Sequence, residues 1–95
     1  MNVRLSDIVI SKNGRDSGKK FFVVDIEENY VFLADGKGRR LERPKRKKRM
    51  HVSFLSESDS RAARKLRDGE RVTNSELRRA LAEHEAAQFG ETGGM

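Results

Sequence analysis

Cysteine and tryptophan are absent from this chain of 95 residues, which has one proline and one tyrosine. Without cysteine it can form neither a disulfide framework nor a thiolate metal site. No apolar run approaches the roughly 18 residues that a membrane-spanning helix needs, and residues 1–10 lack the long apolar core of a signal peptide. These absences predict a soluble cytoplasmic protein with no membrane contact.

Apolar residues are also scarce. Hydrophobic residues make up 35% of the chain and charged residues 38%, whereas globular domains average about 45% and about 25%. We therefore expect one domain with a small core, present as a monomer.

The positive charge is concentrated in the first half of the chain. The net charge is +6 overall. Residues 1–52 contain 14 Lys and Arg against 7 Asp and Glu, whereas residues 53–95 contain 7 against 8. This asymmetry favours a local site for a polyanion over general solubilising charge.

Short strand patterns fill the first 55 residues, and Asp35-Gly36 is a hairpin signal. Pro44 is expected to end the fourth strand, because proline cannot donate to a ladder. The predicted strands are Ile8–Ile10, Phe21–Ile26, Tyr30–Ala34, Arg39–Glu42 and Met50–Leu55. Such a series predicts a mostly β fold, a five-stranded SH3-like barrel over residues 1–55.

The pattern becomes helical after residue 55, so we expect a C-terminal α-helical extension over residues 56–89 and a disordered tail over residues 90–95. Ser58 or Asp59 would cap a first helix that ends near Arg67. A capping box at Thr73 and Glu76 would begin a second helix that ends near residue 87. Its apolar face is formed by Leu77, Ala80, Leu81 and His84. We favour packing of this face on the barrel over contact with a partner.

The segment GRDSGKK, residues 14–20, suits phosphate binding. Gly14 and Gly18 can take positive φ, and successive N–H groups in such a loop can hold an anion. Arg15 can form a fork of hydrogen bonds to a phosphate. The alternative is a plain turn with solvated charges.

A denser basic run, RPKRKKR, covers residues 43–49. Consecutive cations repel one another and gain nothing from folding, so a polyanionic partner is the expected explanation, with counterion release as the driving force. A nuclear localisation signal is the alternative. The predicted RNA-contacting residues are Lys12, Arg15, Lys19, Lys20, Lys37, Arg39, Arg40, Arg43, Lys45, Arg46, Lys47, Lys48 and Arg49. Gly14, Gly18 and Gly36 are predicted to set the loop geometry, and we expect all the basic loops to share one rim.

The aromatic residues are few. Phe22, Phe32 and Phe54 lie in apolar strand patterns and are predicted to be core, whereas Phe21 and Tyr30 are predicted to be partly exposed. This scarcity favours recognition of RNA shape and backbone over reading of a single-stranded sequence.

No catalytic or cofactor pattern is evident. His51 and His84 are far apart and lack metal-binding spacing. GRDSGKK does not have the spacing of a nucleotide-binding P-loop. No Ser–His–Asp order or carboxylate pair stands out, so we predict a protein that is not an enzyme and needs no cofactor.

With these motifs in view, residues 6–55 resemble the KOW-motif RNA-binding proteins, and in particular the small e-type large-subunit ribosomal protein family numbered fourteen and its bacterial relatives. The resemblance rests on the turn Gly14-Arg15-Asp16-x-Gly18-Lys19, on the strand Phe22-Val23-Val24 and on the hairpin Asp35-Gly36. It implies an SH3-like barrel that binds ribosomal RNA and takes part in translation, on the large ribosomal subunit or during its assembly.

Two other functions stay open. KOW domains also occur in transcription factors, so the chain is alternatively a protein-interaction module that contacts ribosomal or transcription proteins. DNA binding through a recognition helix at Thr73–Glu83 is a third reading, against which the net negative charge of residues 53–95 counts.

Overall fold

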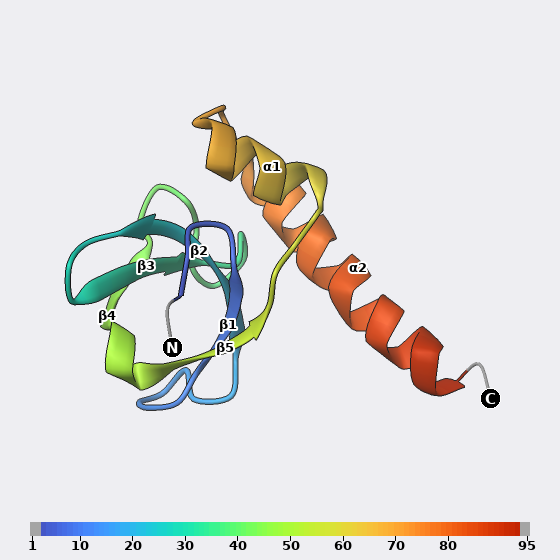
Figure 1. Ribbon diagram of the computed structural model, residues 1–95, viewed down its shortest axis with the longest axis horizontal. Helices are drawn as coiled ribbons and strands as arrows, with labels where there is room; N and C mark the ends of the chain where they lie inside the picture. Colours follow the sequence, from blue (N-terminus) through green and yellow to red (C-terminus); the bar gives the residue numbers. More distant parts are fainter. Residues whose placement is uncertain (1–2, 94–95) are drawn as a thin grey trace.

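Five antiparallel strands form one curled sheet, and two helices pack beside it (Figure 1). The structure is a computed structural model that describes the backbone of residues 3–93 and the side chains of residues 3–88. The strands are β1 (Ile8–Ser11), β2 (Lys20–Ile26), β3 (Tyr30–Ala34), β4 (Lys45–Lys48) and β5 (Val52–Ser56). Their order is β4-β3-β2-β1-β5, so the sheet is open and β4 and β5 are its edges. The predicted mostly β class is confirmed.

Strands β1, β2, β3 and β5 lie where the sequence predicts strands, but the predicted strand at Arg39–Glu42 is wrong. The Asp35 carboxylate accepts hydrogen bonds from the N–H groups of Lys37 and Arg39, both at 2.9 Å, which closes a compact turn at residues 35–39. The Leu41 N–H then donates to the Asn74 side chain at 2.8 Å instead of to a ladder. The fourth strand is β4, within the basic run.

Proline therefore opens the fourth strand and does not end it. Pro44 immediately precedes β4. Because β4 is an edge strand, the missing N–H of a proline at its start costs little. A 3₁₀ turn, η1 (Arg49–His51), then joins β4 to β5.

The sheet is apolar on both faces. Ile8, Phe22 and Ala34 form one buried cluster together with the two helices. The neighbouring residues Val9, Phe21 and Leu33 belong to a second cluster. Because successive side chains of a strand point to opposite faces, the two clusters explain why the strand sequences are continuous apolar runs.

Helix α1 (Arg61–Asp68) is capped at both ends. The Ser60 hydroxyl accepts a hydrogen bond from the Ala63 N–H at 3.1 Å, and Gly69 takes the left-handed conformation at φ 72°. The sequence predicts the N-cap at Ser58 or Asp59, whereas the observed N-cap is Ser60. The Ser58 hydroxyl instead forms a hydrogen bond with the Ser60 hydroxyl.

Helix α2 (Asn74–Gly93) begins with the predicted capping box. The Thr73 N–H donates to Glu76 Oε1 at 3.0 Å, and the Glu76 N–H donates to Thr73 Oγ1 at 3.2 Å. The predicted end near residue 87 is wrong, and residues 90–93 are helical where a disordered tail was predicted; residues 94 and 95 lie outside the described part. Extending an existing helix adds a hydrogen bond per residue, so a glycine alone need not end it.

The apolar face of α2 packs on the sheet, as predicted. Leu77, Ala80 and Leu81 are buried in the cluster that contains Ile8 and Phe22. Within the described residues, no helix is both long and apolar enough to cross a membrane.

Candidate nucleic-acid interface

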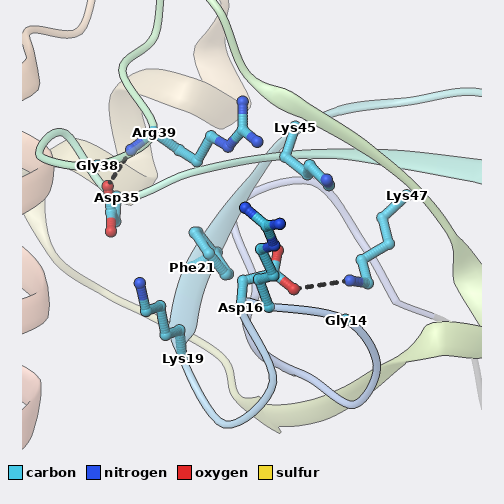
Figure 2. A pocket seen from close by; sticks show the side chains of 10 residues that line it. Gly14, Asp16, Lys19, Phe21, Asp35, Gly38, Arg39, Lys45 and Lys47 are labelled. Carbon is cyan, nitrogen blue, oxygen red and sulfur yellow. Dashed lines mark hydrogen bonds and ion pairs between the residues drawn. The ribbon is translucent and has the colours of Figure 1, made fainter.

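Three separate basic segments line one cavity of about 290 Å³. They are the loop at residues 12–19, the turn at residues 35–39 and strand β4. Figure 2 shows Lys19, Arg39 and Lys45 around this cavity, with the Phe21 ring between them. The shared rim that the sequence predicted therefore exists, and we call this space the cationic cavity. Its charged lining consists of Arg15, Asp16, Lys19, Asp35, Arg39, Lys45 and Lys47.

The 12–19 loop takes its shape from its glycines and a local hydrogen-bond network. Gly14 and Gly18 have φ values of 84° and 85°, in the left-handed region that favours glycine. The Gly18 N–H donates to the Ser11 carbonyl at 2.8 Å. The Ser11 hydroxyl donates to the Asp16 carboxylate at 2.8 Å, which fixes that carboxylate toward β4.

A buried ion pair connects this loop to β4. Lys47 Nζ lies 2.8 Å from Asp16 Oδ1, with side-chain exposures of 8% and 16%. Lys47 also donates to the Asn13 carbonyl at 2.6 Å. Burial opposes ionisation of Asp16, but the hydrogen bonds from Lys47 and Ser11 outweigh it and lower the pKa of Asp16. Two of the three Lys47 N–H donors are thus used within the fold, so Lys47 contributes to the scaffold.

The expectation that the basic run gains nothing from folding is wrong. Besides Lys47, Arg46 forms an ion pair with Glu27 at 3.2 Å. Arg49 donates from its guanidinium to the carbonyl groups of Val3 and Glu27. Successive side chains of the run point to opposite faces of the edge strand β4, so some of these cations form hydrogen bonds and ion pairs within the protein.

The remaining ten predicted cations have no side-chain hydrogen bond or ion pair within the described residues. Asp35, the other acid of the cationic cavity, directs one oxygen to backbone N–H groups. The cavity therefore keeps an excess of positive charge. The ten cations are Lys12, Arg15, Lys19, Lys20, Lys37, Arg39, Arg40, Arg43, Lys45 and Lys48.

The start of α2 holds the 35–39 turn in place, which the sequence did not reveal. The Arg78 guanidinium donates to the Gly36 carbonyl at 2.6 Å. Gly36 has φ 79°, and a Cβ there would overlap the Asn74 carbonyl. The sequence signal for this contact is the glycine itself, which predicts a hairpin turn and not a contact with α2.

A second cavity, of about 520 Å³, lies between α2 and the loops. It shares Lys19 and Asp35 with the cationic cavity and adds Lys20, Lys37 and Arg78. From α2 the lining also includes Glu85, which offsets the charge of Arg78, so the excess positive charge of this cavity comes from Lys19, Lys20 and Lys37.

The aromatic predictions are only partly right. Phe22 is buried as predicted, but Phe21 is also buried, with 1% of its surface exposed, where partial exposure was expected. Phe32 and Phe54 are half-buried, as is Tyr30. Phe21 packs inside the curl of the sheet because its Cβ points to the face opposite to that of Phe22.

No group of three or more His, Cys, Asp or Glu side chains among the described residues is placed to hold a metal ion. Neither models of known protein families nor curated protein sequences match this chain.

Proposed function

We propose that this protein binds RNA without catalysing a reaction, and that the cationic cavity and its surroundings hold backbone phosphates. One observation carries the proposal: Arg15, Lys19, Arg39 and Lys45 converge from three segments and have no partner of opposite charge in the described part of the chain. Uncompensated cations repel one another and oppose folding. A polyanion removes that repulsion and gains affinity from released counterions.

The finer parts of the proposal are an SH3-like barrel of the KOW type and structured ribosomal RNA as the ligand, bound in the cytoplasm at the large subunit or during its assembly. The curl of the antiparallel sheet around a buried cluster supports the barrel. The KOW assignment is supported by the GRDSGK loop between β1 and β2, with both glycines at positive φ.

A salt titration with matched variants tests phosphate binding. In the first variant Arg15, Lys19 and Arg39 are replaced by alanine. In the control the replaced residues are Arg4, Arg61 and Arg71, which are exposed, lie outside the cationic cavity and form no side-chain hydrogen bond or ion pair within the described residues. Both lower the net charge equally. Affinity for a fluorescein-labelled RNA hairpin is measured by anisotropy from low to high salt.

We expect the slope of log K against log [salt] to become shallower by about 2–3 in the first variant, since each lost contact contributes about 0.7–0.9. The control should keep most of the wild-type slope. Equal slopes for the two variants would mean that net charge, and not this cavity, attracts RNA.

Sedimentation of cell lysate through a sucrose gradient tests the ribosomal part. Co-migration of the tagged protein with the large subunit, lost after RNase treatment, is the expected result. Residence at the top of the gradient under every salt condition would contradict stable ribosomal association.

A further inference from the structure

The outer face of β3 and β4, on the side of the sheet opposite to the cationic cavity, combines aromatic rings with cations. In the antiparallel register Tyr30 lies opposite Lys48 and Phe32 lies opposite Arg46, so these four side chains share one face. Val31 and Leu33, which point the other way, lie in a buried cluster. Lys45 and Lys47 also point the other way and line the cationic cavity.

The helices leave this part of the outer face uncovered. Ala34 lies on the same face as Tyr30 and Phe32 and is buried with α1 and α2. Strand β4 and the beginning of β3 lie on the side of the molecule away from both helices (Figure 1). Tyr30 and Phe32 are half-buried and belong to neither buried cluster of the described residues.

The Arg46 guanidinium makes a cation–π contact with the Tyr30 ring on this face. Its Cζ lies 3.6 Å above the centre of the Tyr30 ring, and its Nε is 3.2 Å from Glu27 Oε1. Glu27 offsets the charge of Arg46, which makes Arg46 a poor phosphate ligand. The Arg46 side chain is also 54% exposed, so part of it is accessible to a ligand.

We propose that this outer face stacks unpaired RNA bases, with a base on the Arg46 guanidinium and Lys48 beside it to contact the attached phosphate. Guanidinium planes and aromatic rings are the surfaces on which single-stranded bases stack. Lys48 is exposed and has no partner in the described residues, so the face complements an anionic ligand. The proposal rests on the proposed function and adds to it a contact with bases in a single-stranded segment.

The test distinguishes contacts with the bases from contacts with the phosphates. Affinity is measured by anisotropy for two labelled RNAs of equal length, one an oligoadenylate and the other an abasic backbone that carries the same phosphates. The variants are Tyr30→Leu, which removes the ring beneath the guanidinium, and Arg46→Lys, which keeps the charge and removes the plane. Tyr30→Phe is the matched control, and circular dichroism checks that each variant is folded.

We expect Tyr30→Leu to bind the oligoadenylate roughly 5- to 150-fold more weakly, since a stacked base contributes about 1–3 kcal/mol. Arg46→Lys should lose affinity for the oligoadenylate as well, whereas neither variant should change binding to the abasic RNA. Tyr30→Phe should match the wild type with both RNAs.

The chain has one tyrosine and no tryptophan, so its intrinsic tyrosine emission reports on Tyr30 alone. We expect this emission to change when the oligoadenylate binds and to stay constant with the abasic RNA.

Equal effects of Tyr30→Leu and Arg46→Lys on the two RNAs, or no effect on either, would overturn stacking and favour a protein as the occupant of this face. In that case, binding of the abasic RNA that is lost in the Arg15, Lys19 and Arg39 variant would leave the proposed function intact. If the wild-type protein bound neither of these two RNAs but still bound the RNA hairpin, stacking would be overturned and the proposed function would stand; loss of hairpin binding as well would overturn both.

Discussion

The buried Asp16–Lys47 pair allows a sharp test of how this small fold is stabilised. Replacing Lys47 by methionine preserves most of the side-chain volume but removes two charge-assisted hydrogen bonds, to Asp16 and to the Asn13 carbonyl. Such bonds contribute about 1.5–3 kcal/mol each. Relief from burying the lysine charge offsets part of this loss. We therefore expect the free energy of unfolding to fall by about 3 kcal/mol, in line with breaking other buried pairs.

The loss should depend on Asp16. In Lys47→Met the Asp16 carboxylate keeps only the Ser11 hydroxyl as a side-chain donor, and its Oδ2 is already buried without a partner among the described residues. Adding Asp16→Asn removes the uncompensated charge, so the double variant should cost clearly less than the sum of the two single changes.

Urea unfolding at pH 7, followed by far-ultraviolet circular dichroism, measures these differences. Lys48→Met is the matched control, because Lys48 is the next residue of the same strand, exposed and without a partner in the described chain. It should change stability by no more than about 0.5 kcal/mol. A similarly small change for Lys47→Met would refute the argument that the pair stabilises the fold.

Three further predictions concern stability. The folded-state pKa of Asp16 lies below its usual value of 3.8. The ionised carboxylate therefore stabilises the fold above pH 3.8, and this stabilisation is lost as the pH falls through the folded pKa. In urea unfolding below about pH 4, Asp16→Asn should lose less stability on acidification than the wild type. Gly36→Ala should cost more than about 2 kcal/mol, because φ is positive and a Cβ overlaps the Asn74 carbonyl, whereas Gly38→Ala, with open space around the site, should be nearly neutral in thermal melts. Thr73→Ala should cost about 1 kcal/mol through loss of the capping box, and Thr73→Ser should restore most of it; equal helix content and stability for all three proteins would contradict the capping role.

The elements set by local chemistry were predictable from the sequence. The apolar run at residues 21–26 predicted β2, and the Thr73-x-x-Glu76 spacing predicted the start of α2; both are confirmed. The start of α2 depends on hydrogen bonds between residues three apart, and β2 follows from a run of β-branched and aromatic residues that favours a strand. The capping residue of α1 was missed by one or two positions, because several serines compete there.

The failures arise where a distant partner decides the outcome. Leu41 bonds to Asn74, 33 residues away, and this contact replaces the expected fourth strand. Lys47 is buried because Asp16, 31 residues away, neutralises it. In the sequence Lys47 is indistinguishable from Lys48, so composition predicted the basic surface but not which of its members serve the fold.

The contacts between α2 and the 35–39 turn mean that the sequence boundary near residue 55 does not separate two independent parts. A chain ending there would retain all but the last residue of β5, yet it would lose the guanidinium that holds the Gly36 carbonyl and the side chain that holds the Leu41 N–H. The smallest fragment able to present its basic surface correctly must therefore extend to at least Arg78. Shortening the protein at its apparent domain border would preserve a sheet and discard the support of the surface that the sheet displays.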